Sequence, residues 1–183
     1  PHLHLSVQAG DDLVLKRMKR RHLRHDIIEF CRLARSARPD IVFGADLIAG
    51  FPTENEEMFL RTVDLVDECG LTWLHVFPYS ERPGTPAARM PMVPVAVRRE
   101  RAAILRNVGE VAESRFLQSR IGNTANILVE QNGEGRTEHY ARARLVHPTG
   151  QLVTSFDSKL AVARIMGVEE QTLTATPINQ FTS

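Results

Sequence analysis

Strand-like and helix-like segments alternate over the first 120 residues of this 183-residue chain. The strand-like runs cover residues 3–7, 41–48 and 71–77, and the helix-like runs cover residues 12–36, 53–70 and 95–120. This alternation is typical of β/α units whose strands form a parallel sheet. Because ligands bind at the carboxyl ends of the strands in such sheets, we expect the loops at 6–10, 46–54 and 77–86 to share one rim.

Periodicity and end signals predict how the first helices lie. Residues 12–36 fit one or two helices, with a buried stripe formed by Ile27, Phe30, Cys31 and Ala34. Thr53 is followed three positions later by Glu56, which is the pattern of a capping box. A helix is therefore expected to begin there and to end at Gly70, a residue type that commonly terminates helices.

The pattern changes after Gly122. Short alternating stretches at 127–130 and 140–146 are separated by turn-forming sequence, NGEG at 132–135 and HPTG at 147–150. Several short strands joined by such turns predict a small β-barrel or sandwich in the last third of the chain.

The chain has two cysteines, Cys31 and Cys69, both in predicted helices. Two cysteines so far apart exclude a disulfide scaffold and any four-cysteine metal centre made by this chain alone, and they favour a reducing, cytoplasmic setting. No apolar run approaches the roughly 18 residues of a membrane span. We therefore expect no membrane partner.

The histidines do not predict a metal site. His2 and His4 alternate on one strand, and His22 and His25 are three positions apart, but no third ligand follows at a diagnostic spacing. His75 lies within a strand-like run, where a buried, hydrogen-bonded histidine is the simpler interpretation. We expect no resident metal in this chain.

Charge is segregated along the sequence although the net charge is only +1. Lys and Arg outnumber Asp and Glu by nine to four in residues 1–38 and by eight to three in residues 82–120, whereas acidic residues predominate by nine to one in residues 39–81. The densest basic cluster contains Lys16, Arg17, Lys19, Arg20, Arg21 and Arg24. Such a cluster is either a solvated helix face or a surface that binds a phosphate backbone.

Two loops at the predicted rim carry residues suited to binding. The segment DLIAGFPTENEE at 46–57 turns a strand into a helix through Gly50 and Pro52, where a ligand could approach the backbone closely. The segment YSERPGTPA at 79–87 offers an aromatic ring and several hydrogen-bond donors. On spacing alone, an ordinary strand-to-helix turn and a proline-terminated strand remain equally good interpretations.

Three segments in this order resemble the methylthiotransferase branch of the radical S-adenosylmethionine (SAM) enzymes. They are HLSVQAGDDLVLKRMKRRH at 4–22, DLIAGFPTENEEMF at 46–59 and FPYSERPGTPAARM at 77–90. The form FGADLIAGFPTE is similar to the group that acts on threonylcarbamoyladenosine in tRNA, whereas the isopentenyladenosine group tends to have GFPGET.

The resemblance implies a partial enzyme. Residues 1–118 would be the second half of a radical SAM β/α barrel with parallel strands, ending in a long basic helix, and residues 119–183 a TRAM-like, RNA-binding β-barrel. Family members hold one 4Fe–4S cluster on an N-terminal domain and a second on a CxxxCxxC loop. Neither cysteine here lies in that motif, so the cluster ligands are expected upstream of Pro1. The fragment is expected to hold neither cluster, to contain no catalytic residue and to be inactive alone.

The same motifs imply which residues face S-adenosylmethionine. Ser6 and Gln8 match the part that faces its ribose and methionyl portions. The strand along the adenine is matched by Asp46, Ile48 and Gly50, with Glu54 just beyond. The loop that lines the floor where cofactor and target base meet is matched by Tyr79, Ser80 and Arg82. One departure is Ala9, where many relatives have Ser; the TRAM-like segment also departs from the family pattern after Leu152.

The reaction implied for the complete protein begins with reduction of S-adenosylmethionine to a 5′-deoxyadenosyl radical. That radical abstracts a hydrogen from C2 of the modified adenosine at position 37, and a methylthio group is installed there. The partner implied is the tRNA anticodon stem-loop, and the residues expected to hold its phosphates are Lys16, Arg17, Lys19, Arg20, Arg21, Arg136, Arg142 and Arg144.

Two other functions fit the sequence. One is a non-catalytic RNA-binding module that keeps only the half-barrel and TRAM architecture. The other is an unrelated hydrolytic α/β enzyme that uses Asp46, Glu54 and His75. Half a barrel would also leave unpaired edge strands at residues 3–7 and 71–77, so we expect the fragment to dimerise through them.

Overall fold

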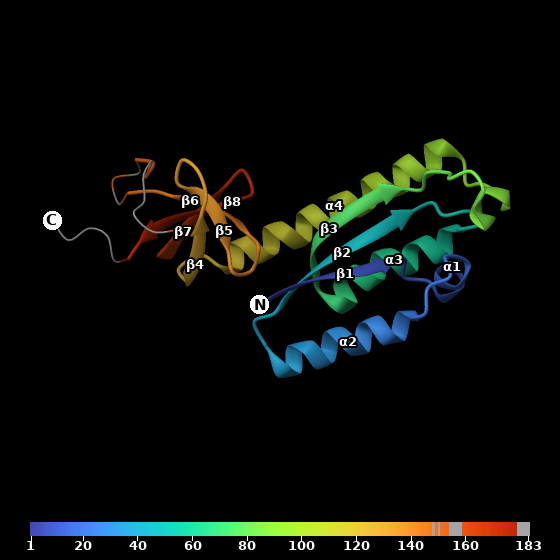
Figure 1. The fold of residues 1–183 in the computed structure, drawn as a ribbon, viewed down its shortest axis with the longest axis horizontal. Coiled ribbons are helices and arrows are strands. Elements are labelled where there is room, and N and C mark those ends of the chain that lie inside the picture. Colours follow the sequence, from blue (N-terminus) through green and yellow to red (C-terminus); the bar gives the residue numbers. More distant parts are fainter. Residues whose placement is uncertain (148, 150, 154–158, 179–183) are drawn as a thin grey trace. The chain divides into compact units, whose positions relative to one another are not determined.

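The computed structural model describes residues 1–147, 149, 151–153 and 159–178. Contacts between residues divide the chain into two compact units, Leu3–Ala112 and Glu113–Ser183 together with Pro1–His2. We call them the sheet unit and the barrel unit. The sheet unit contains, in chain order, β1 (His2–Gln8), α1 (Asp12–Arg17), α2 (Arg24–Ala37), β2 (Val42–Ala49), α3 (Glu56–Cys69), β3 (Leu71–Pro78), the short 3₁₀ helix η1 (Pro86–Arg89) and most of α4 (Val95–Ser119). The predicted alternation of strands and helices is confirmed (Figure 1).

The strands of the sheet unit lie in the order β1, β2, β3. The pairing of β2 with β3 is parallel, with Asp46 opposite His75 and Ile48 opposite Phe77. Figure 1 shows the arrows of all three strands pointing the same way. Their carboxyl ends therefore meet at one edge of the sheet, as the sequence predicted.

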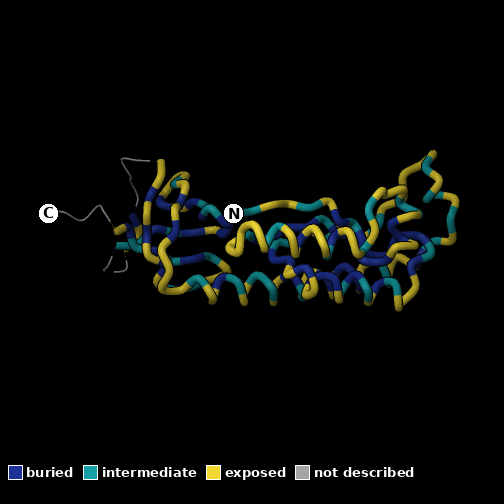
Figure 2. Tube along the Cα trace, turned by 90° about the horizontal axis from the view of Figure 1, so that it is seen from below, coloured by how far each residue is buried: buried dark blue, intermediate teal, exposed yellow. Residues whose placement is uncertain are grey.

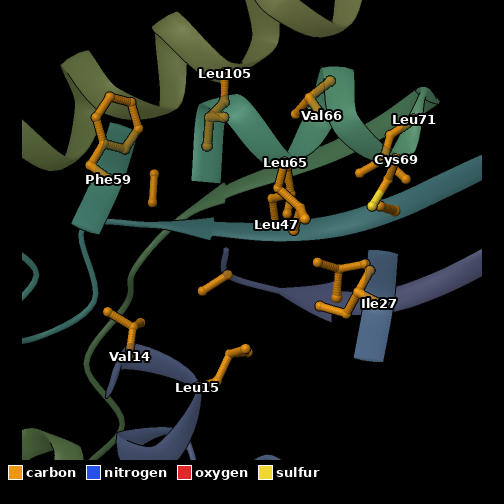
Figure 3. Packing of buried hydrophobic residues seen from close by; sticks show 14 of the residues in the cluster. Val14, Leu15, Ile27, Leu47, Phe59, Leu65, Val66, Cys69, Leu71 and Leu105 are labelled. Carbon is orange, nitrogen blue, oxygen red and sulfur yellow. The ribbon is translucent and has the colours of Figure 1, made fainter. Parts of the chain in front are cut away.

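One face of this sheet forms the core. Alternate strand residues, among them Phe43, Leu47 and Leu71, are fully buried and pack against side chains from the helices. Figure 3 shows Leu47 beside Leu65 of α3, with Leu105 of α4 in the same cluster. Because side chains alternate along a strand, the intervening residues project from the other face, and those are half-buried or exposed on β1 and β3.

The helix α2 buries a narrower stripe than its sequence suggested. In α2 the buried residues are Ile27 and Cys31, whereas Phe30 is 45% exposed, so its assignment to the buried stripe was wrong. Residues at i and i+4 lie on one helix face, and Phe30 falls to the side of the line from Ile27 to Cys31. Figure 2 shows exposed and buried stretches alternating along the helices.

The helix α3 begins two residues later than predicted. Asn55 is its N-cap and accepts a hydrogen bond from the Met58 amide, whereas Thr53 lies in the preceding turn with a φ of 67°. The end of the helix is confirmed: Gly70 is the C-cap, with a φ of 54° in the left-handed region that glycine tolerates. The Arg35 guanidinium donates hydrogen bonds to the Cys69 and Gly70 carbonyls at this end.

The barrel unit contains five strands: β4 (Thr124–Val129), β5 (Glu134–Thr137), β6 (Arg142–Leu145), β7 (Leu160–Glu169) and β8 (Thr172–Pro177). They form a closed barrel in which neighbouring strands follow the order β4, β5, β6, β8, β7. Of the two predicted architectures, the barrel is therefore confirmed and the sandwich is not. Buried and exposed residues alternate along β7 and β8, with Ile165, Leu173 and Ala175 inside. Of the predicted turn at 147–150, Pro148 and Gly150 lie outside the described residues. Across the described residues, no helix has the length and apolar character that crossing a membrane requires.

Candidate functional site

A pocket of about 720 Å³ opens at the carboxyl edge of the sheet. Its walls come from the ends of the three strands, from the end of α1 with the turn after it, and from the loop after β3. The lining residues are Gln8, Arg17, Met18, Lys19, Arg20, Asp46, Ile48, Phe51, Phe77, Pro78, Tyr79, Ser80, Arg82, Thr85, Pro86 and Ala87. Its volume is within the range of small-molecule and cofactor sites.

The structure brings together six of the nine residues predicted to face a cofactor: Gln8, Asp46, Ile48, Tyr79, Ser80 and Arg82 all line the pocket. Ser6 and Gly50 do not line it. Ser6 is exposed, and its carbonyl accepts a hydrogen bond from Arg20. At Gly50 the φ is 73°, and a β-carbon there would lie 2.5 Å from the side chain of Arg98. Gly50 is thus required by backbone shape and close packing.

Glu54, the ninth predicted residue, points into the fold. Its carboxylate accepts hydrogen bonds from the Gly50 amide at 2.8 Å and from Arg101 of α4 at 2.9 Å. Both side chains of the ion pair are buried, at 1% exposure for Glu54 and 7% for Arg101. Burial raises the pKa of Glu54, and the Gly50 amide and the Arg101 guanidinium oppose that rise. In this arrangement Glu54 fixes the turn between β2 and α3.

The basic residues predicted to contact phosphates separate into two groups. Arg17, Lys19 and Arg20 line the pocket, while Lys16 and Arg21 stand outside its lining. The helix α1 ends at Arg17, and Lys19 follows with a φ of 58°, which turns the chain sharply after the helix. Residues predicted to face the cofactor and residues predicted to bind phosphate therefore line the same pocket of the sheet unit.

The other three predicted phosphate ligands belong to the barrel unit. Arg142 is exposed on β6, and Arg144 on the same strand pairs with Glu134 at 3.1 Å. Arg136 lies over the ring of Tyr140, with 4.3 Å from its guanidinium carbon to the ring centre. The Tyr140 ring also stacks on His2, with the ring centres 4.9 Å apart and the planes 6° apart, so a base that stacked here would have to compete with these contacts.

Two buried polar atoms of pocket residues lack a hydrogen-bond partner among the described residues: the hydroxyl of Tyr79 and Nη1 of Arg17. The Tyr79 ring meets Phe51 edge-on at 5.3 Å and has the Arg98 guanidinium over it. Buried polar groups are normally satisfied, so these two donors have capacity left for a bound molecule or water. Both suit a ligand with acceptor oxygens, such as a carboxylate or a phosphate.

Sequence reasoning missed one cluster. His4 of β1, Asp46 of β2 and His75 of β3 lie side by side across the sheet, on the face away from the core. The distances from Asp46 Oδ1 are 2.9 Å to His4 Nε2 and 3.3 Å to His75 Nδ1. Each residue lies three or four positions before the last residue of its strand. That similar position in three parallel strands was the signal available in the sequence.

The chain is similar in sequence to known proteins of the radical SAM superfamily that modify tRNA. Residues 1–66 match the radical SAM superfamily. The chain is 49% identical over 175 residues to threonylcarbamoyladenosine tRNA methylthiotransferase MtaB of Rickettsia prowazekii, covering 93% of the chain and 39% of that relative. It is 34% identical over 170 residues to the tRNA-2-methylthio-N(6)-dimethylallyladenosine synthase of Bartonella bacilliformis, covering 92% of the chain and 36% of that relative. The synthase of the same name from Coxiella burnetii is 40% identical over 164 residues, covering 84% of the chain and 37% of the relative.

The chain thus spans less than two fifths of the length of these curated relatives. The relatives match 84% to 93% of the chain, and the superfamily match includes the segments at 4–22 and 46–59. The superfamily match and these identities together show that the chain belongs to the radical SAM tRNA methylthiotransferase family. It corresponds to one part of a family member.

Proposed function

We propose that this chain is the part of a tRNA methylthiotransferase that positions S-adenosylmethionine and the tRNA. The substrate would be C2 of N6-threonylcarbamoyladenosine at position 37 in the anticodon stem-loop. Of the relatives compared above, identity is highest to one whose name states threonylcarbamoyladenosine, which supports this substrate. The pocket that unites six predicted cofactor residues with three basic residues carries the proposal.

The pocket fits S-adenosylmethionine in size and chemistry. Gln8, Tyr79, Ser80 and Arg82 would bind its polar groups, and Ile48 would contact the adenine. The unpartnered Tyr79 hydroxyl and Arg17 nitrogen match the carboxylate of the methionyl portion. When bound, the cofactor supplies the radical chemistry together with 4Fe–4S clusters. The residues of this chain would orient it in the pocket.

Cys31 and Cys69 do not fit a cluster. Both are buried in the core of the sheet unit, among apolar side chains of α2, α3 and the strands. The cysteine ligands of two clusters would therefore lie in the rest of a longer protein. That protein would carry the activity, and this chain alone would be inactive.

The tRNA would contact both units. In this proposal residues 1–118 are the second half of a radical SAM barrel, and residues 119–183 are a TRAM-like domain whose arginines hold phosphates. Backbone contacts of this kind weaken steeply as salt concentration rises. Because the substrate is tRNA, we propose a cytoplasmic location.

A non-catalytic RNA-binding module is the second candidate. The exposed arginines and Tyr140 of the barrel unit are compatible with it. The hydrolytic alternative has lost its support, because Glu54 is held in a buried pair with Arg101 and does not line the pocket that contains Asp46.

Methylthiolation of tRNA by the longer protein tests the enzyme proposal. We expect Arg82→Ala to lower the rate by about ten- to a hundredfold, because a charge-assisted hydrogen bond to the substrate or cofactor is lost. Arg89→Ala, which removes an arginine of η1 outside the pocket lining, is the matched control and should retain the rate. Mass spectrometry of tRNA carrying either threonylcarbamoyladenosine or isopentenyladenosine reads out both rate and substrate. Equal rates for the two variants would contradict the site, and modification of the second tRNA alone would contradict the substrate.

We also propose that the isolated chain dimerises through the outer strands of its sheet. β1 and β3 are the two edges of the three-stranded sheet, and edge strands present unpaired backbone groups. Leu3, 41% exposed on β1, should contribute to the contact, so Leu3→Lys should shift the chain toward monomer. Light scattering at high protein concentration measures this, and a chain that is monomeric before the substitution contradicts the dimer.

A further inference from the structure

We propose that His4, Asp46 and His75 form a binding site for a divalent transition-metal ion of the zinc type. The three ligand atoms lie within 4.8 Å of one another, and each comes from a different strand. The pocket function described above does not require such an ion, so this proposal goes beyond it.

The spacing of the three atoms suits a metal ion. Ligand atoms about 2.0–2.1 Å from a tetrahedrally coordinated zinc ion lie about 3.3 Å apart. Asp46 Oδ1 is 2.9 Å from His4 Nε2 and 3.3 Å from His75 Nδ1, close to that edge length. The two imidazole rings, which come from the strands on either side of β2, are tilted by 37° with their centres 4.7 Å apart. Small side-chain rotations would complete the geometry.

The sheet holds the three ligands in place before any ion binds. Asp46 on the central strand lies between Ala45 and Leu47, whose side chains are fully buried on the other face. Asp46 is opposite His75 in the parallel register, and its carboxylate contacts His4 on the other neighbour. Ligands on adjacent strands are held more precisely than ligands on loops, which favours a site with low reorganisation cost.

Two imidazoles and one carboxylate specify the kind of ion. Mg²⁺ and Ca²⁺ prefer oxygen ligands, whereas imidazole suits zinc, copper, nickel and iron. Three protein ligands leave at least one coordination position for water or an added ligand, as in catalytic zinc sites. The side chain of His75 is 57% exposed, so an ion can reach the site from solvent.

Asp46 also lines the pocket, whereas His4 and His75 do not, so the metal site and the pocket would share Asp46. An ion there could bind an oxygen or nitrogen atom of a molecule in the pocket. Asp46 would then contact a bound molecule through the ion, which His4 and His75 also hold, in addition to any direct contact with the cofactor.

Titration of the untagged 183-residue chain with Co²⁺ tests the site, because bound Co²⁺ absorbs visible light in a way that depends on its ligands. We expect one ion per chain, displaced by Zn²⁺ according to the usual affinity order. His75→Ala and Asp46→Asn should each weaken binding by at least about tenfold. Far-UV circular dichroism and melting temperature confirm that each variant is folded, and His4→Gln is the second variant should one of them unfold.

His25→Ala is the matched control, since His25 lies 3.2 Å from Asp26 in an exposed pair that has no third ligand among the residues the structure describes. It should bind Co²⁺ as the unchanged chain does. The proposal would be overturned if the folded chain showed no saturable Co²⁺ binding, or if binding survived both His75→Ala and Asp46→Asn. The cluster would then be held together by hydrogen bonds alone. The measurement uses neither S-adenosylmethionine nor tRNA, so its failure is separate from failure of the proposed function.

Discussion

At the scale of single residues, the strongest constraint on the rim is the buried pair of Glu54 and Arg101. Arg101 also donates to the Glu54 carbonyl and to Glu56, and its guanidinium lies over the Phe59 ring. One side chain of α4 thereby fixes both the turn that follows β2 and the start of α3. A buried ion pair adds little net stability, yet removing one partner leaves a charge without compensation.

Replacement of Arg101 by Met should therefore destabilise the chain by about 3–5 kcal/mol at pH 7. The pKa of Glu54 is raised in the folded protein, and loss of the arginine should raise it further. A carboxyl group with a raised folded pKa contributes most stability below its unfolded pKa and loses that contribution as the pH rises through the folded pKa.

Arg101→Met should accordingly recover part of its stability as the pH falls from 7 toward 5, which urea unfolding at several pH values would measure. Arg99→Met, at an exposed position of the same helix, is the control and should change little. An equal deficit at both pH values would show that Glu54 is not the group left uncompensated.

At the scale of elements, the sequence predicted the strands of the sheet and the ends of α4 almost to the residue. Apolar β-prone runs and helical periodicity are local signals, and tertiary contacts here reinforce them. The start of α3 was misplaced because Thr53 and Asn55 are both good caps, and only the turn fixed by Glu54 and Gly50 selects between them. The cluster of His4, Asp46 and His75 was missed for a similar reason, since ligands 42 and 29 positions apart have no local spacing.

The choice of cap makes a direct prediction. Asn55→Ala should lower the free energy of unfolding by about 1 kcal/mol, because the Met58 amide loses its acceptor. Thr53→Ala should lower the free energy of unfolding by no more than about a few tenths of a kcal/mol, because Thr53 accepts no hydrogen bond from the amides of the first turn of α3. Thr53 is also a β-branched residue at positive φ, where its side chain is strained. Urea denaturation compares the two, and the reverse order would restore Thr53 as the cap.

At the scale of the whole molecule, the sheet unit and the barrel unit each have a buried core of their own. The apolar cluster of the sheet unit draws on β1 to β3 and α1 to α4, while Ile127, Leu145 and Ile165 are fully buried in the barrel unit. The single tryptophan, Trp73, is in β3. Its fluorescence therefore reports on the sheet unit, whereas circular dichroism reports on both.

Leu145→Ala should remove about 2–5 kcal/mol from the stability of the barrel unit, because it leaves a cavity in a closed core. We expect the transition seen by circular dichroism to broaden or divide, while the Trp73 transition shifts much less. Leu128→Ala, 54% exposed on β4, is the control and should leave both transitions in place. Coincident shifts of the two signals would mean that the chain unfolds as one cooperative body.

The position of β8 has a consequence for synthesis on the ribosome. β8 lies between β6 and β7 in the barrel, yet it is the last of the five strands to be translated. Until Pro177 has left the exit tunnel, the growing chain exposes the open edges of β6 and β7 and the apolar residues that β8 later covers. The sheet unit precedes these strands and can complete its core earlier. During translation the nascent barrel is thus the stretch that would most need protection by chaperones.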